Sequence, residues 1–489
     1  MVSIVDPIGV FKVLVDNRIM RAQIKSLTSY CEVDGKSRLE IALEIYAGIR
    51  DPKEVCRRCR WTYRLVNWLL NLGAKSFGAS KEELKTVMKD VYWRRGLAAV
   101  VKGLGMFGVK KPFVPGAPFL IVWDVTYACN LKCKHCYANA GKPWPDELTT
   151  DEAKRVIDCF ANAGVVTIAW SGGEPMVRPD IYELSKYAYD KGIYVAMATN
   201  GTLINEKTAD KLWESGVRFL QISLDEIDPK KHDEFRGVDG AWRRTIEGIK
   251  VAVKKGFFVN IAMVGLKDNK EDIPKVIDLT EKLGARWFML YNFVPTGRGV
   301  FIGEYDLSPE EREEILKMMW REMKKRKIGI LTTAPQYSRI AIMEEAGVTD
   351  HFIFPTHFQN AELGGRLKSL ADFIGGCGAG RFYIGLYPNG DIRPCVFFPM
   401  TLGNIMDIID SFDEWWMNNP VLNELRNKDI LKGPCGTCPY RYVCGGCRAR
   451  AYGYLGDYLG PDPGCIINIE VYNKLLSLHA NGGELSSKP

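Results

Sequence analysis

The sequence predicts an α/β protein built around a parallel sheet that closes, fully or in part, into a barrel. Three observations carry this prediction. Short apolar runs alternate with helical patterns between residues 116 and 305, as in repeated β–α units. A mostly helical segment precedes these units, and a segment rich in Cys, Gly and Pro follows them. We therefore expect five parts, at residues 1–115, 116–305, 306–372, 373–470 and 471–489.

Composition limits the class of protein. A chain of 489 residues is long enough for two or three domains, and with 46% hydrophobic and 26% charged residues most of it is expected to fold. The longest apolar stretch, residues 97–109, contains Lys102 and is too short to span a bilayer. The first ten residues lack the basic region and apolar run of a signal peptide. We therefore expect a cytoplasmic protein.

Residues 1–115 are predicted to form an N-terminal helical domain that ends near Pro112, Pro115 and Pro118. This segment has 21 Lys and Arg against 11 Asp and Glu, a balance of +10 in a chain of net charge +7. The excess indicates either an anionic partner or a solvated basic surface. Because Trp, Phe and Leu alternate with Arg and Lys, as in interfacial helices, we hypothesise peripheral docking on an anionic membrane.

The central strands are expected to be buried on both faces, because their sequences are nearly continuously apolar. A helix begins at the capping box Thr149–Glu152, and another runs from Ser308 to the basic residues 324–327. Residues from about 331 to 372 are predicted to connect the barrel with the Cys-rich domain. The six predicted strands are FLIVWDVT (119–126), VVTIAWSG (165–172), YVAMATNG (194–201), FLQISLD (219–225), VNIAMVG (259–265) and WFMLYNFV (287–294).

The 14 cysteines are the main indication of function. Disulfides are rare in the reducing cytosol, so closely spaced cysteines there indicate metal ligands. Cys129, Cys133 and Cys136 directly follow the first strand, where three thiolates can hold three irons of a [4Fe–4S] cube and leave the fourth iron open. A zinc ion would need a fourth ligand, and His135 is poorly placed because it directly precedes Cys136. The lone Cys159 is expected to be a core residue.

A C-x3-C-x2-C loop after the first strand of a six-strand β/α barrel resembles the radical S-adenosylmethionine (radical SAM) superfamily, over roughly residues 119–300. The resemblance implies a partial (β/α)6 barrel of the radical SAM type. It also implies that SAM chelates the open iron and is cleaved reductively to a 5′-deoxyadenosyl radical, which abstracts hydrogen from an unactivated carbon. A reducing protein such as ferredoxin or flavodoxin would supply the electron. The resemblance names no catalytic acid or base.

The resemblance further implies which residues contact SAM. The tetrapeptide Gly172-Gly173-Glu174-Pro175 ends the second strand and resembles the family's GGEP motif, which contacts the methionyl amino group. The other implied contacts lie at later strand ends: Asn200, Ser223 and Asp225 toward the ribose or methionine, Arg236 on the SAM carboxylate, and the segment beginning Val294-Pro295 against adenine.

Seven cysteines near the C-terminus resemble the SPASM domain, which binds two auxiliary [4Fe–4S] clusters, although one gap is x2 instead of x3. The family's interleaved pattern implies that one iron of the second cluster has no cysteine ligand. This open site could bind substrate or take a ligand other than cysteine, or the domain could hold fewer clusters. A pair of structural zinc sites is the alternative. The implied ligands are Cys435, Cys438, Cys444 and Cys465 for the first cluster and Cys377, Cys395 and Cys447 for the second.

Cys31, Cys56 and Cys59 form a third group. Three thiolates could hold a mononuclear metal or complete a cluster elsewhere. Ordinary buried or free thiols are the interpretation that we favour, because no histidine lies nearby.

From the N-terminal segment we hypothesise a hydrophobic substrate, such as a membrane lipid of the archaeal tetraether type. Because SPASM enzymes include peptide maturases and haem-pathway (tetrapyrrole) decarboxylases, these are the alternatives. An iron–sulfur electron carrier or scaffold is the alternative from another class. A nucleic-acid partner is disfavoured, since the apolar residues of segment 1–115 are too dense for a stacking surface.

Overall fold

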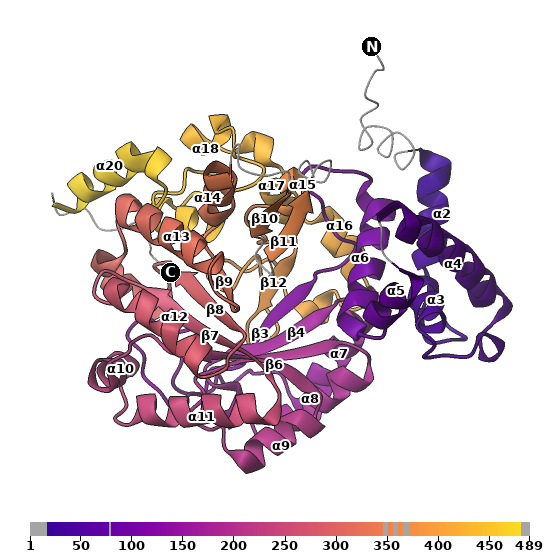
Figure 1. Cartoon of the computed structure of the whole chain (residues 1–489), viewed down its shortest axis with the longest axis horizontal. Coiled ribbons are helices and arrows are strands. Elements are labelled where there is room, and N and C mark those ends of the chain that lie inside the picture. The colour runs from indigo at the N-terminus through magenta and orange to yellow at the C-terminus, as the bar shows by residue number, and fades with distance from the viewer. Residues whose placement is uncertain (1–16, 78–79, 346–350, 356–359, 365–370, 481–489) are drawn as a thin grey trace.

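The computed structural model describes residues 17–77, 80–345, 351–355, 360–364 and 371–480. Its centre is a nine-stranded sheet in the order β13-β12-β3-β4-β5-β6-β7-β8-β9 (Figure 1). Neighbouring strands from β3 to β8 are all parallel, which confirms the predicted β/α barrel core. The six predicted strands are β3 (Leu120–Thr126), β4 (Thr167–Gly172), β5 (Tyr194–Thr199), β6 (Val217–Ser223), β7 (Phe258–Gly265) and β8 (Trp287–Asn292).

Side chains alternate along each barrel strand, so one face of the strand meets the covering helices and the other meets the barrel interior. In β3, Trp123 points toward the covering helices, where its ring lies 5.5 Å from that of Trp170 and 6.3 Å from that of Phe160. Its neighbour Val122 points the other way, into a cavity. The covering helices are α7 (Thr150–Ala163), α8 (Ile181–Asp190), α9 (Glu206–Glu214), α10 (Pro229–Arg236), α11 (Ala241–Lys255), α12 (Ile273–Lys282) and α13 (Pro309–Met323).

The two predicted helix starts are confirmed. Thr149 and Glu152 cap α7 reciprocally, and Ser308 and Glu311 do the same for α13. The α13 helix ends at Met323 with Lys324 as its C-cap. Cys159 lies in α7 and belongs to the main hydrophobic core, as expected.

The prediction of a connecting segment from about residue 331 is wrong for the first part of that segment. Gly329–Thr332 forms β9, which pairs in parallel with β8, and α14 (Gln336–Glu345) follows it. The chain therefore builds a seventh β–α unit onto the barrel. Farther along, β10 (His351–Pro355) and β11 (Asn360–Gly364) form an antiparallel hairpin, and the remainder of 346–370 lies outside the described residues.

The Cys-rich C-terminal part extends the other edge of the same sheet. Strand β12 (Tyr383–Leu386) pairs in parallel with β3, and β13 (Ile392–Arg393) pairs antiparallel with β12. The expected tail from residue 471 is helical up to Ala480, and 481–489 lie outside the described residues. The remaining helices of this part are α15 (Ala371–Ile374), α16 (Phe412–Asn418), α17 (Pro420–Arg426), α18 (Gly433–Thr437), α19 (Arg448–Leu455) and α20 (Ile469–Ala480).

The N-terminal domain is mostly helical, as predicted, and its helices α2 to α5 gather at one side of the barrel (Figure 1). Arg95 of α6 anchors it to the barrel. This buried side chain donates hydrogen bonds to the carbonyls of Val165 and Ala161, both at 2.8 Å, and pairs with Glu40 at 3.1 Å. The elements are α2 (Arg18–Thr28), β1 (Tyr30–Cys31), β2 (Lys36–Ser37), α3 (Arg38–Tyr46), α4 (Arg57–Phe77), α5 (Lys81–Met88) and α6 (Val91–Phe107).

Within the part of the chain that the structure describes, no helix combines the length and the apolar character needed to cross a membrane.

Candidate active site

A cavity of about 540 Å³ runs through the barrel, a volume typical of ligand pockets. Cys129, Cys133 and Cys136 border it at the carboxyl ends of the strands. At the amino ends, aromatic rings form a floor, with Phe219 stacked on Phe258 at 5.4 Å and Trp287 against Phe258 at 4.7 Å. Tyr92 and Trp93 of α6 complete this floor, so the N-terminal domain contributes to the cavity.

The cysteine loop is held by backbone hydrogen bonds and by one arginine. The N–H of Cys129 donates to the carbonyl of Gly141 at 3.2 Å. Arg298 donates from Nε to the carbonyl of Cys133 at 2.9 Å and from Nη1 to that of Ala140 at 2.7 Å. Arg298 was not among the predicted site residues, although it stands in the predicted segment that begins at Val294.

The glycine pair of the GGEP motif allows the end of β4 to touch this loop. A Cβ on Gly172 would lie 2.3 Å from the carbonyl oxygen of Thr126, and one on Gly173 would lie 2.1 Å from that of Ala128. The N–H of Gly173 donates to the Thr126 carbonyl at 2.8 Å. The two glycines thus allow a close approach to the backbone of Thr126 and Ala128, and both also line the cavity.

Glu174 is fully buried and joins the ends of β4 and β5. Its carboxylate accepts hydrogen bonds from Thr199 Oγ1 at 2.7 Å, from the backbone N–H of Asn200 at 2.8 Å and from that of Met176 at 3.1 Å. Burial raises the pKa of Glu174 above its usual value. Glu174 and Pro295 do not line the cavity, whereas Gly172, Gly173, Asn200, Ser223, Asp225, Arg236 and Val294 do.

Asp225 and Arg236 form a buried ion pair of 2.5 Å beside the cysteine loop, with Arg236 Nη1 3.6 Å from Cys133 Sγ. Burial opposes ionisation of Asp225, but Arg236 lowers the pKa of this carboxyl below its usual value. Within the described residues, Arg236 Nε has no hydrogen-bond partner. A buried, unused guanidinium donor at the cavity wall fits the carboxylate of SAM.

The spacing of the three loop cysteines fits a multi-iron cluster. Among the described residues, one group of potential ligands has all its ligand atoms within 4.8 Å of one another, and it lies elsewhere, at Cys31. Cys129, Cys133 and Cys136 border one cavity end, and their three sulfur atoms do not all lie within 4.8 Å of one another. This is expected where each thiolate binds a different iron. His135 is half-buried and stacks on Phe235 at 4.5 Å.

The C-terminal cysteines divide between two hollows. Cys377, Cys395 and Cys447 line the barrel cavity together with the cysteine loop. Cys435, Cys438, Cys444 and Cys465 line a second, much smaller hollow that also contains Arg339 and Arg441. The structure thus brings together the same two sets that the SPASM resemblance implies.

Three polar side chains in the barrel interior were missed by the sequence analysis. Tyr291 O–H and Asn260 Nδ2 donate to Gln221 Oε1 at 3.0 and 3.3 Å, and Asn260 Oδ1 has no partner within the described residues. All three lie on the cavity-facing side of their strands. The strand alternation could have identified them, since polar residues inside otherwise apolar runs point to a lined cavity.

Two family models match the chain, the radical SAM superfamily over residues 123–280 and the SPASM iron–sulfur cluster-binding domain over residues 377–439. The chain belongs to the radical SAM superfamily and carries a SPASM domain. It is therefore an enzyme that uses SAM and iron–sulfur clusters. Residues 1–115 lie outside both matches.

Relatives align with most of the chain. This chain is 40% identical over 352 residues to the AdoMet-dependent heme synthase of Methanosarcina barkeri. The alignment covers 72% of this chain and 97% of the relative. The AdoMet-dependent heme synthase of Nitratidesulfovibrio vulgaris is 36% identical over 350 residues, covering 71% and 91%. The crystal structure of Streptococcus suis SuiB bound to precursor peptide SuiA matches with a TM-score of 0.60 at 18% identity, covering 87% and 92%, which shows the shared fold.

Proposed function

We propose that this enzyme removes a carboxyl group from a side chain of a tetrapyrrole by radical chemistry. The observation that carries the proposal is a single cavity bordered by both Cys129, Cys133 and Cys136 and the set Cys377, Cys395 and Cys447. Generation of a radical and removal of an electron from the substrate can therefore occur at the same bound molecule. The heme-synthase relatives, which align over nearly their whole length, support a tetrapyrrole as this molecule.

The proposed reaction balances as follows. With one electron from a reduced ferredoxin or flavodoxin, SAM and its cluster supply methionine and a 5′-deoxyadenosyl radical. This radical takes one hydrogen atom from the carbon next to the carboxylate-bearing carbon of the substrate. The bond to the carboxylate then breaks, CO₂ leaves, an alkene forms, and one electron is released, which a cluster held by Cys377, Cys395 and Cys447 would accept.

The residues of the chain position the substrate and exclude water. The aromatic floor of Phe219, Phe258 and Trp287 offers flat apolar surfaces that suit a planar macrocycle. Tyr92 and Trp93 cover part of the amino end of the barrel, and exclusion of water from the cavity would protect a reactive radical from side reactions. Gln221, Asn260 and Tyr291 supply the polar contacts above the floor.

The test uses the full chain, reconstituted anaerobically with iron and sulfide and supplied with SAM and a reductant. We expect carboxylate-bearing porphyrins to increase 5′-deoxyadenosine release and to yield a product with one carboxyl group replaced by an alkene. A membrane-lipid extract forms the second arm, because a lipid was the first substrate hypothesis. Stimulation by lipid alone, without conversion of any porphyrin, would contradict the tetrapyrrole proposal.

Membrane docking is a separate proposal, supported by one face of α4. Arg57, Trp61, Arg64 and Trp68 are exposed and follow one another at helical spacing, and Trp61 and Trp68 are each 61% exposed. Alternating cations and indoles suit anionic headgroups and the boundary of the acyl chains. We expect vesicles with anionic lipids to retain the wild type but not a Trp61→Ser/Trp68→Ser variant. Equal retention of both proteins would contradict docking through this face.

A further inference from the structure

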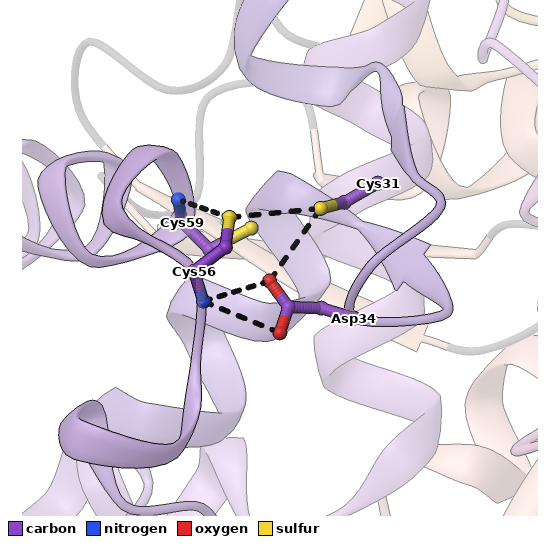
Figure 2. A group of neighbouring side chains, drawn as sticks. All are labelled: Cys31, Asp34, Cys56 and Cys59. Carbon is purple, nitrogen blue, oxygen red and sulfur yellow. Dashed lines mark hydrogen bonds between the residues drawn. The ribbon is translucent and has the colours of Figure 1, made fainter.

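Four potential metal ligands, two from the β1–β2 hairpin and two from the start of α4, meet in the N-terminal domain (Figure 2). Cys31 ends strand β1, and Asp34 lies in the turn that leads to β2. Cys56 directly precedes α4, and Cys59 stands in the first turn of that helix. All four ligand atoms lie within 4.8 Å of one another. Asp34 was missed by the sequence analysis, which considered the three cysteines alone.

The distances fit a single tetrahedral ion. Around zinc, with Zn–S bonds of about 2.3 Å, two thiolates lie about 3.8 Å apart, and a thiolate and a carboxylate oxygen about 3.5 Å apart. Cys31 Sγ lies 3.7 Å from Cys56 Sγ and 3.4 Å from Asp34 Oδ2. A [4Fe–4S] cube would separate the sulfurs more widely, because each binds a different iron.

Hydrogen-bond donors and positive charge surround the four ligands. The backbone N–H of Cys59 donates to Cys56 Sγ at 3.4 Å, and that of Cys56 donates to Asp34 Oδ2 at 3.2 Å. Arg50 lies 3.6 Å from Asp34 Oδ1, and the positive end of the α4 dipole faces the site. Cys31 and Cys59 are 5% and 0% exposed, so bound metal would be shielded from water.

We propose that Cys31, Asp34, Cys56 and Cys59 bind one structural zinc ion. The donor set is closed, with four protein ligands and no open position, which is typical of structural zinc. The ion would fasten the β1–β2 hairpin to the start of α4. Each strand of this hairpin has two residues, too few to be stable alone. The site is therefore separate from the iron–sulfur chemistry of the barrel.

The experiment measures metal in the full chain after anaerobic reconstitution of the clusters and removal of loosely held zinc by a chelator. We expect about one tightly held zinc per chain, with three sulfurs near 2.3 Å and one oxygen near 2.0 Å in its X-ray absorption spectrum. The spectrum of the wild type tests the ligand set even where a variant fails to fold. The double variant Cys31→Ser/Cys56→Ser is expected to lose this zinc.

Two further variants sharpen the result. Cys159→Ser removes a buried cysteine far from this site in sequence and is expected to keep one zinc per chain. Asp34→Asn is expected to weaken zinc retention about 10- to 100-fold against a competing chelator. The proposal is overturned by an all-sulfur coordination shell, by iron in place of zinc, by a Cys31–Cys56 disulfide in the anaerobic protein, or by equal zinc loss in Cys159→Ser.

Discussion

Gly173 shows how one residue can control the position of the cluster loop. Gly173→Ala would place a Cβ 2.1 Å from the carbonyl oxygen of Ala128, in backbone that cannot move without shifting Cys129. We expect a loss of about 1–3 kcal/mol in stability and a fall in 5′-deoxyadenosine release. Gly141→Ala is the matched control in the same loop, because nothing lies within 4 Å of its added Cβ. Equal behaviour of the two variants in thermal unfolding and SAM cleavage would contradict this explanation.

Glu226, next to the Asp225–Arg236 pair, gives the protein a specific pH dependence. Burial, and then the neighbouring carboxyl of Asp272, raise the pKa of Glu226 from 4.5 to about 8. The folded state therefore binds a proton that the unfolded state has released, so stability falls as pH rises from 4.5 to 8. We expect Glu226→Gln to flatten this decline, measured by denaturant midpoints across that range. An unchanged slope in the variant would show that other groups cause it.

At the scale of elements, the sequence identified the six long apolar strands, missed the short strand β9 and could not predict where β12 pairs. The six barrel strands contain continuous apolar runs, and all six are present. Strand β9 has only the four residues GILT, too few for a periodic pattern, and is stabilised by the edge of β8. Strand β12 could not be placed on β3 from sequence, because more than 250 residues separate them.

Helix α6 joins the N-terminal domain to the barrel, and Arg95 is the buried cation among its contacts. Arg95→Met would leave Glu40 buried without its cation and the carbonyls of Val165 and Ala161 without a donor. We expect a loss of about 3–5 kcal/mol, seen in denaturant unfolding and in faster proteolysis of the N-terminal domain. Arg94→Met is the control, since Arg94 donates to the nearby carbonyls of Met88 and Lys89. If both variants lose the same stability, Arg95 is not the anchor.

At the scale of the molecule, the sequence predicted which cysteines would matter but not the cavity that they share. Cys129 and Cys395 are 266 positions apart, and only the pairing of β12 with β3 brings their segments to one wall. The contribution of Tyr92 and Trp93 to the floor was equally hidden, because it depends on how α6 docks. Motif spacing describes local ligand sets, whereas a cavity is a product of tertiary packing.

The two sets of C-terminal cysteines are expected to respond differently to mutation. Cys395→Ala alters the set that borders the cavity, so the ratio of product to 5′-deoxyadenosine should fall more than about tenfold. Cys438→Ala alters the set in the separate hollow and should lower this ratio less. Each variant should also lose about four irons per chain. Equal ratios in the two variants would contradict a direct role of the Cys395 set at the substrate.

The placement of both cysteine sets on one cavity also bears on the energy that the cell must supply. In the proposed reaction one electron enters to cleave SAM and one leaves the substrate after CO₂ is lost. In that reaction the electron would leave through a cluster at Cys377, Cys395 and Cys447, and the second set contains Cys438, the half-buried member of an otherwise buried group. Turnover then consumes no net electrons. One redox carrier that donates the electron for SAM cleavage can accept the electron that leaves the substrate. Such an enzyme would need reducing power to start but little to continue.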